Sequence, residues 1–125
     1  MQSLVDLAPT ILSFAGVPIP QTMTGCDQRK VWLGEQQQAR EHIICEYRTQ
    51  PTAVHQKTFV DERYKITIYY NRPYGELFDL KEDPNELNNL WDAPESLELK
   101  AELLLKYAWA ELGKEPLAMP RVSGA

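Results

Sequence analysis

The chain has 125 residues, of which 43% are hydrophobic and 25% are charged, a composition typical of one folded globular domain. Its formal net charge of −5 argues against binding to nucleic acid or to an anionic membrane surface, and no apolar run approaches membrane-spanning length. Cys26 and Cys45 are too few for a disulfide framework, and we interpret them as unpaired thiols.

Residues 3–16 predict a short amphipathic helix, because apolar residues recur at helical spacing. We expect Asp6 to be its N-cap, which places Pro9 in the first turn, where no internal backbone donor is needed. The apolar face of this helix comprises Leu7, Ile11 and Phe14. Roughly 25 poorly patterned residues separate the helix from the next regular element, so we assign it to a larger α/β domain.

The connection that follows is predicted to be irregular. Residues 17–25 contain two prolines and predict an extended connector, and residues 28–40 predict a loop or a short helix. We therefore divide the chain into residues 1–40, the remnant of a larger α/β domain with its connector, and residues 41–125, a C-terminal subdomain.

Four segments rich in β-branched and aromatic residues predict strands. These segments are residues 42–47, 53–60, 63–70 and 75–80. The connections between them are too short for parallel crossovers, so we expect an antiparallel meander.

The longest helix is predicted to begin near Pro94 and to run to Gly113. Its predicted apolar stripe consists of Leu97, Ala101, Leu104, Ala108 and Leu112, with Leu105 and Trp109 beside it. We expect this helix to cover one face of the sheet, and the chain end with Pro116 and Pro120 to lie outside that packing. The predicted fold is therefore α+β: a roughly four-stranded antiparallel sheet packed against a long C-terminal helix, preceded by a helix that belongs to a missing α/β domain.

The acidic stretch from Glu76 to Leu90 contains the most distinctive motif of the chain. Its first five residues alternate as in a half-buried strand. Asp83 is then suited to cap a helix whose first residue is Pro84, and Glu86 is placed to reach back as in a capping box. Leu87 and Leu90 would share one face of that helical turn and anchor it.

Calcium binding is the alternative interpretation of this stretch, because four carboxylates crowd together in it. They belong to Asp79, Glu82, Asp83 and Glu86. A calcium loop needs oxygen ligands at fixed alternate positions and a glycine at its sharp turn. Lys81 occupies one of those positions and no glycine follows, so we favour the capping role.

The stretch resembles the closing signature of the sulfatase family, E-L-Y-D-L-x-x-D-P-x-E-x-x-N-L. Val5–Leu12 and Ala15–Pro18 resemble the family's D-L-x-P-T-L-L-x-x-A-G helix, and Val31–Gly34 resembles part of its connector. Arg63–Ile66 matches the R-x-x-Y-K-x-I strand in part. Four such pieces in the family's order indicate a resemblance to the C-terminal portion of a sulfatase over nearly the whole chain.

The resemblance implies that catalysis belongs to a large α/β domain upstream of residue 1. In that domain a Cys or Ser of a C/S-x-P-S-R motif becomes formylglycine, and a calcium ion offsets the sulfate charge. We expect no catalytic residue, metal ligand or cofactor in this chain itself. Cys26 precedes Asp27, Gln28 and Arg29 and so lacks that motif, and we interpret it as a connector thiol. A bacterial parent of the family is expected to be periplasmic or secreted.

Arg48 and His55 are the candidate substrate-binding residues, because the family's C-terminal subdomain lines part of the substrate cleft. In such a cleft Arg48 would contact a sulfate or carboxylate bidentately and His55 a sugar hydroxyl. The alternative, which we favour for each residue, is that Arg48 pairs with a surface acid and His55 lies on an exposed strand face. A set of tyrosines, Tyr64, Tyr69, Tyr70 and Tyr74, is either a carbohydrate-stacking platform or, as we favour, ordinary sheet packing.

Three functions are therefore open from the sequence. In the first, the chain is the C-terminal fragment of a sulfuric ester hydrolase, with the missing N-terminal sulfatase domain as its partner. In the second, it is a stand-alone, non-catalytic interaction or oligomerisation module, and its exposed apolar patch mediates self-association. In the third, it is the tail of a related phosphate or phosphonate ester hydrolase.

Overall fold

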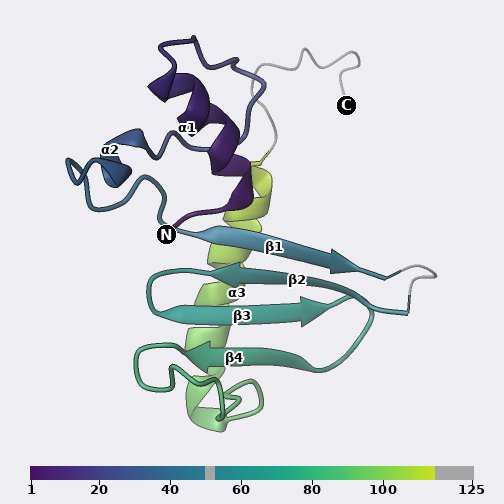
Figure 1. Cartoon of the computed structure of the whole chain (residues 1–125). Coiled ribbons are helices and arrows are strands. Elements are labelled where there is room, and N and C mark those ends of the chain that lie inside the picture. The colour runs from purple at the N-terminus through teal and green to yellow at the C-terminus, as the bar shows by residue number, and fades with distance from the viewer. Residues whose placement is uncertain (50–52, 115–125) are drawn as a thin grey trace. The chain divides into compact units, whose positions relative to one another are not determined.

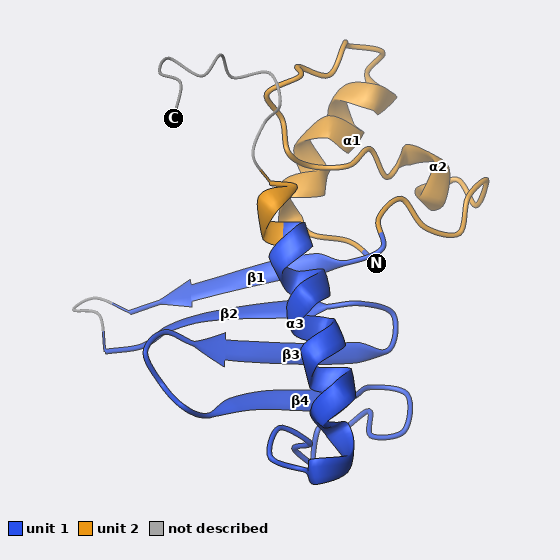
Figure 2. Ribbon diagram, turned by 180° about the vertical axis from the view of Figure 1, so that it is seen from behind, with its two compact units in different colours: residues 1, 41–110 blue, residues 2–40, 111–125 orange. Residues whose placement is uncertain are grey.

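The computed structural model describes residues 1–49 and 53–114. The chain divides into two compact units, one formed by Met1 and residues 41–110 and the other by residues 2–40 with the described residues from 111 on (Figure 2). In the part of the chain that is described, no helix has the length and apolar character needed to cross a membrane. The prediction for the end with Pro116 and Pro120 lies outside the described residues. The predicted division into a domain remnant and a subdomain stays a prediction.

The first unit is built on a four-stranded antiparallel sheet with the strand order β1-β2-β3-β4 (Figure 1). The strands are β1 (Ile43–Arg48), β2 (His55–Val60), β3 (Tyr64–Tyr69) and β4 (Gly75–Asp79). The four predicted strands and the meander are thereby confirmed. In a meander, the β1–β2 and β3–β4 connections lie at the same end of the sheet, so their residues can meet.

One face of the sheet packs against a long helix, α3 (Leu97–Leu112), which follows the 3₁₀ turn η2 (Pro94–Ser96) (Figure 1). The buried core between the two layers comprises Phe59, Ile66, Leu77, Leu103 and Ala110. Phe59, Ile66 and Leu77 are aligned by the strand register on this one face. The prediction of a long helix over one sheet face is confirmed.

The predicted apolar stripe of α3 is wrong, because a different face of the helix enters the core. Leu103 is fully buried, and Leu99 and Tyr107 pack beside it. The exposed side chains of the predicted stripe and its flank are Leu97, Ala101, Leu105, Ala108, Trp109 and Leu112, whereas Leu104 does pack against the core. Apolar residues surround most of this helix, so their periodicity alone did not identify the face that is buried.

The predicted helical turn after Asp83 is also wrong, because residues 80–93 form turns without a helix. Glu86 has a φ of 54°, a left-handed conformation that is incompatible with continuing a right-handed helix. The Asp83 carboxylate accepts a hydrogen bond from the backbone N–H of Asn88 at 2.8 Å and so stabilises a turn. The Glu86 carboxylate pairs with Lys65 instead of reaching back to Asp83.

Within the Glu76–Leu90 signature, the side chain of Asn89 forms hydrogen bonds with the backbone at the outer edge of β4. Its Oδ1 accepts hydrogen bonds from the backbone N–H of Leu77 at 2.9 Å and of Trp91 at 3.0 Å. Its Nδ2 donates to the carbonyl oxygen of Gly75 at 3.1 Å, and the N–H of Leu90 donates to the carbonyl oxygen of Leu77 at 2.8 Å. Asn89 and Leu90 thus satisfy backbone groups that an edge strand would leave unpaired.

The residues after Asn89 close the end of the core. Leu90 and Trp91 pack against it, whereas Leu87, the second predicted anchor, is 85% exposed. The Trp91 ring lies so close to Gly75 that an added Cβ would come within 2.5 Å of a ring carbon. Only glycine fits at that position. Lys100 also holds Trp91 in place, because its Nζ donates a hydrogen bond to the Trp91 carbonyl oxygen at 2.6 Å.

The second unit contains η1 (Leu4–Asp6), α1 (Leu7–Phe14) and α2 (Arg29–Trp32). The helix predicted within residues 3–16 is present, and residues 28–40, predicted to be a loop or a short helix, contain the short helix α2. Asp6 occupies the predicted N-cap position of α1, but its side chain makes no capping hydrogen bond to that helix. It is also the last residue of η1, and its buried carboxylate reaches back to accept a hydrogen bond from the Ser3 N–H at 2.8 Å.

A buried polar network around Asp6 ties this helix to the connector. Asp6 Oδ1 accepts a hydrogen bond from the Cys26 N–H at 2.8 Å and pairs with Arg40, and Oδ2 accepts one from Gln28 Nε2 at 3.2 Å. Thr10 Oγ1 donates to the Asp6 carbonyl oxygen at 2.6 Å and accepts from the Gln28 N–H at 2.9 Å. The helix therefore buries its polar face within this unit.

The apolar face of the same helix is consequently exposed in the described chain. Leu7, Ile11 and Phe14, which were predicted to share a face, all retain at least a third of their accessible surface, and Ile11 is 60% exposed. Leu4 and Val5 of η1 are exposed as well. This face is named the α1 apolar face and comprises Leu4, Val5, Leu7, Ile11 and Phe14.

We expect Asn89→Ala to lower the free energy of unfolding by roughly 1–3 kcal/mol, because it leaves buried backbone groups of Leu77 and Gly75 without partners. Urea unfolding followed by circular dichroism measures the loss. Asn88→Ala is the matched control, since only the backbone N–H of Asn88 is engaged, and it should change stability by less than about 0.5 kcal/mol. Equal effects of the two substitutions would contradict the edge-closing role of Asn89.

We expect the stability of the second unit to fall in acid because of Asp6. Burial alone would raise the pKa of Asp6, but hydrogen bonds from Ser3, Cys26 and Arg40 together hold the pKa below its ordinary value. A lowered pKa in the folded state means that the stabilisation is present above the unfolded pKa of about 3.9 and is lost as the pH falls through the folded value.

Asp6→Asn should therefore cost roughly 3–5 kcal/mol at pH 7 and should flatten the acid dependence below about pH 4. Hydrogen exchange of the α1 amides at several pH values measures both effects. Glu35→Gln removes an exposed carboxylate from the same unit and should leave the exchange profile unchanged. An Asp6→Asn variant with the acid dependence of the wild type would show that Asp6 is not the group responsible.

Candidate functional site

Arg48 and His55, the two predicted substrate-binding residues, are brought together as a cross-strand pair of β1 and β2. Nη2 of Arg48 lies 3.2 Å from Nε2 and 3.5 Å from Nδ1 of His55. Because side chains alternate along a strand, both residues lie on the same sheet face as Ile44 and Phe59, at the end next to the β1–β2 connection.

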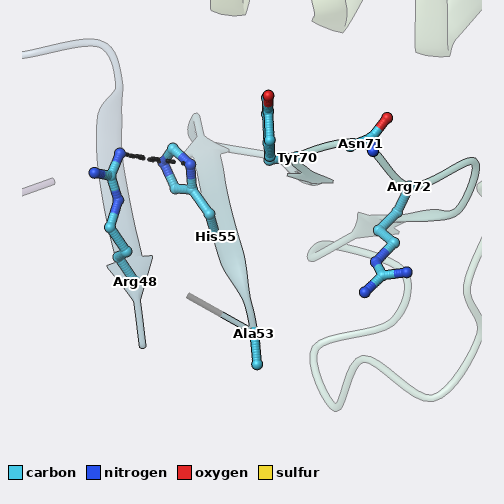
Figure 3. Close-up of a pocket in the computed structure, with 6 residues that line it drawn as sticks. All are labelled: Arg48, Ala53, His55, Tyr70, Asn71 and Arg72. Atoms are coloured by element: carbon cyan, nitrogen blue, oxygen red, sulfur yellow. Dashed lines mark hydrogen bonds between the residues drawn. The ribbon is translucent and has the colours of Figure 1, made fainter. Parts of the chain in front are cut away.

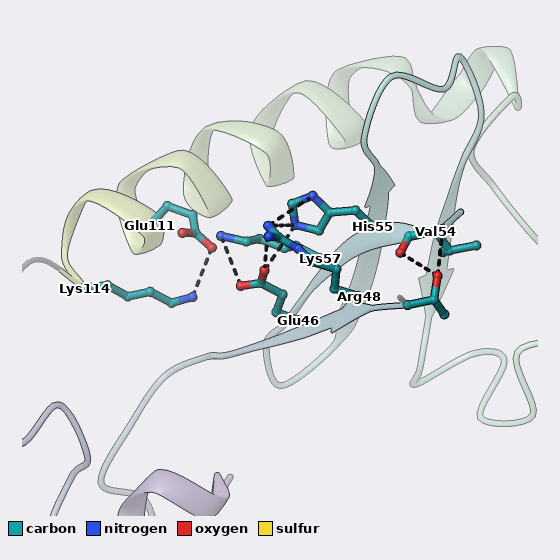
Figure 4. A network of polar contacts seen from close by, with 8 residues as sticks. Glu46, Arg48, Val54, His55, Lys57, Glu111 and Lys114 are labelled. Atoms are coloured by element: carbon teal, nitrogen blue, oxygen red, sulfur yellow. Dashed lines mark hydrogen bonds and ion pairs between the residues drawn. The ribbon is translucent and has the colours of Figure 1, made fainter. Parts of the chain in front are cut away.

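Glu46 connects this pair to a second basic residue, Lys57 (Figure 4). His55 Nε2 lies 3.1 Å from Glu46 Oε1, and the same oxygen lies 3.5 Å from Arg48 Nη2. Glu46 Oε2 lies 3.7 Å from Lys57 Nζ. These pairs are partly exposed and add little to stability, so their main effect is to orient the Arg48 and His55 side chains.

A hollow of about 390 Å³ opens beside the pair (Figure 3). Its lining residues are Arg48, Ala53, His55, Tyr70, Asn71 and Arg72. Residues 70–72 belong to the β3–β4 connection, which a meander places at the same end of the sheet as the β1–β2 connection. The hollow is therefore a product of the sheet topology, and its volume lies within the range of roughly 300–1,000 Å³ that is typical of small-molecule sites.

Sequence reasoning considered Tyr70 for carbohydrate stacking but missed the contribution of Asn71 and Arg72 to this hollow. The signal was available, because a predicted four-stranded meander already brings the β1–β2 and β3–β4 connections together. The backbone N–H of Tyr70 donates to the carbonyl oxygen of His55 at 2.8 Å, which extends the β2–β3 pairing to the hollow. Asn71 adopts a left-handed conformation with a φ of 54°, which turns the chain back toward β4.

The tyrosines divide between packing and exposure. Tyr64 packs against the core, in line with the favoured interpretation. Tyr69 Oη donates to Glu76 Oε1 at 2.8 Å, and burial together with this hydrogen bond raises the pKa of Tyr69 to about 12. Tyr70, by contrast, is 77% exposed, and its ring centroid lies 5.9 Å from that of His55. Tyr70 is thus available to a molecule in the hollow.

Three of the four carboxylates that suggested a calcium site, those of Asp79, Asp83 and Glu86, are engaged in other contacts. Arg63 donates to both oxygens of Asp79 at 2.8–3.2 Å and thereby lowers the pKa of Asp79. Glu86 pairs with Lys65. Within residues 1–49 and 53–114, no group of three or more His, Cys, Asp or Glu side chains is arranged to hold a metal ion. Cys26 and Cys45 are both free thiols.

Comparison with known proteins places this chain in a family. The model of the family described as N-sulphoglucosamine sulphohydrolase, C-terminal, matches residues 1–111. The chain belongs to this family. The resemblance to the C-terminal portion of sulfatases that the four motifs indicated is therefore confirmed.

Two relatives of this family member come from Bacteroides thetaiotaomicron. The Δ4,5-hexuronate-2-O-sulfatase is 30% identical over 104 residues, which cover 81% of this chain and 22% of that protein. The N-acetylglucosamine-6-O-sulfatase is 29% identical over 107 residues, which cover 80% of this chain and 19% of that protein. The chain thus spans about a fifth of the length of these relatives.

Solved structures share the fold. A protein solved in complex with its substrate D-glucosamine-2-N,6-O-disulfate has a TM-score of 0.78 at 25% identity, over 92% of this chain and 25% of that one. The phosphonate monoester hydrolase of Silicibacter pomeroyi has a TM-score of 0.76 at 20% identity, over 94% of this chain and 27% of that one. The antiparallel sheet with its long helix is therefore common to sulfatases and to phosphonate hydrolases.

Proposed function

We propose that this chain is the C-terminal subdomain of a sulfuric ester hydrolase. In this role it completes the fold and the substrate cleft of a larger N-terminal sulfatase domain and does not catalyse alone. The family match over residues 1–111 and the chain's short span relative to its relatives support the proposal. Formylglycine and calcium would belong to the N-terminal domain, and a periplasmic or secreted location would follow for a typical bacterial parent.

The α1 apolar face is the observation that carries the proposal. Leu4, Val5, Leu7, Ile11 and Phe14 are exposed on it, while the opposite face of the helix is held by the buried Asp6 network. A contiguous exposed apolar surface on a helix that is fixed from behind is typical of an interface. We infer that the N-terminal domain covers this face, because more than three quarters of each relative's length lies outside the matched region.

We further propose that the substrate is a sulfated sugar. Two relatives are named for sulfates on a hexuronate and on N-acetylglucosamine. Arg48 would contact an anionic group of this sugar and His55 one of its hydroxyls, as predicted from the sequence. The phosphonate hydrolase shares the fold at only 20% identity, so a phosphate or phosphonate ester is the second candidate. A stand-alone interaction module is the third, and the exposed α1 apolar face is compatible with it.

We expect the 125-residue chain to hydrolyse no 4-nitrophenyl sulfate at any calcium concentration, and the gene to extend in frame upstream of Met1. The extension should encode a Cys- or Ser-x-Pro-Ser-Arg motif. Absorbance at 400 nm against a buffer blank and the DNA sequence are the two measurements. Turnover by the isolated chain would contradict a non-catalytic role, and a stop codon upstream would favour the stand-alone module.

We expect the isolated chain to self-associate through the α1 apolar face, because exposed apolar area favours association. Sedimentation velocity should show the weight-average mass rising with protein concentration. Ile11→Lys should abolish that rise, since Ile11 is 60% exposed and a charge would have to be buried in the interface. Gln37→Lys adds the same charge at an exposed position of the same unit and should leave association unchanged. A monomer at all concentrations would contradict the expectation.

A further inference from the structure

The hollow is a local concentration of positive charge in a chain whose formal net charge is −5. Arg48, His55 and Arg72 line it, and none of its six lining residues carries a carboxylate. Glu46 offsets part of the charge of Arg48 from outside the lining. The hollow therefore favours an anion over a neutral or cationic ligand.

Arg72 is the side chain that is available to such a ligand. Its guanidinium has no hydrogen bond or ion pair with any residue in 1–49 or 53–114. Figure 3 shows Arg48 and His55 on one side of the hollow and Arg72 on the other, so a bound group would lie between them. A guanidinium matches the geometry of sulfate and carboxylate, to which it donates two parallel hydrogen bonds.

Tyr70 and Asn71 supply the remaining features of a sugar site. The Tyr70 ring is 77% exposed beside His55 and offers a flat apolar surface to the C–H face of a pyranose ring. The Asn71 amide, which also lines the hollow, has both donor and acceptor groups for hydroxyls. The His55 ring is held by Glu46 and Arg48, so it is oriented before a ligand arrives.

We propose that this hollow binds a pyranose that carries a sulfate or carboxylate group, with Arg72 and Arg48 as the anion clamp and Tyr70 as the stacking surface. The proposal rests on the proposed function for the class of sugar, and it adds Arg72, Asn71 and Tyr70 to the residues that recognise it. Arg72 is the principal determinant of affinity, because Arg48 is shared with Glu46 and His55.

The test is a titration of the 15N-labelled 125-residue chain with D-glucosamine 6-sulfate, D-glucuronate, D-glucosamine and inorganic sulfate, followed by amide NMR shifts. We expect the sulfated sugar to shift the amides of Arg48, His55 and residues 70–72, and unsubstituted glucosamine to bind at least about tenfold more weakly. The glucuronate titration shows whether the clamp also accepts a carboxylate. Inorganic sulfate bound as tightly as the sulfated sugar would remove Tyr70 and Asn71 from the proposal.

Arg72→Ala should weaken binding of glucosamine 6-sulfate by about tenfold, and Tyr70→Ala should weaken it without changing the relative preference for the sulfate group. Lys81→Ala is the matched control, because the Lys81 ammonium makes no hydrogen bond or ion pair with the described residues and lies outside the lining of the hollow. Melting curves of all three variants establish that each is folded. Equal affinities of the Arg72→Ala and Lys81→Ala variants, or shifts confined to residues outside the hollow, would overturn the proposal.

The two proposals fail separately. If the gene has no upstream extension but the hollow binds a sulfated sugar, only the subdomain role is overturned. The chain would then be a carbohydrate-binding module. An upstream sulfatase domain together with no binding at the hollow would retain the subdomain role and overturn only the hollow as a sugar site.

Discussion

The register of the four strands is the constraint on which the rest of the first unit depends. Pairing of Phe59 with Ile66 and of Ile66 with Leu77 places three large side chains under α3. Because side chains alternate with a period of two, a slip of one residue in β2 would move Phe59 out of the core and turn His55 to the opposite face. The packing of the core therefore also fixes the position of the hollow, although the hollow shares no residue with the core.

The edges of the sheet explain why the family signature needs no catalytic role. β4 is an edge strand, and Asn89 and Leu90 provide the hydrogen bonds that a neighbouring strand would give it. Asp79 fixes the end of β4 through Arg63, and Asp83 shapes the turn that brings Asn89 back. Asp79 and Asp83 thus make local contacts that position Asn89 at the edge of β4. This is a sufficient physical reason for the spacing of Asp79 and Asp83.

Strand existence, strand order and the long helix were predictable from the sequence, because alternation and short connections allow few arrangements. The buried face of α3 was not, since Leu97 and Leu103 are equally apolar and only the sheet determines which of them is covered. Asp83-Pro84 resembles a helix start, yet the left-handed Glu86 and the demands of the β4 edge prevail over that local preference. For the site, the structure brings Arg48 and His55 together as a cross-strand pair, and their use as ligand contacts remains a prediction. Arg72 was missed because residues 70–72 were considered only as the connection between β3 and β4. Their position at the same end of the sheet as the β1–β2 connection was not considered.

The N-terminal helix inverts the usual arrangement of an amphipathic helix, and this inversion has a physical logic. The contacts that join Asp6 and Thr10 to Gln28 and Arg40 link residues far apart in the sequence and need no large apolar core. Gly25 permits the connector to approach, because a Cβ there would lie 2.0 Å from the Val5 carbonyl oxygen. The helix is thereby held in place by polar contacts from one side, and its apolar side remains exposed. A segment fixed by its own hydrogen bonds can present an apolar face without losing its conformation, which lowers the entropic cost of docking. The Val5–Leu12 motif, which resembles the family's N-terminal helix, thus preorganises the surface through which, in the proposed function, this chain would join a larger domain.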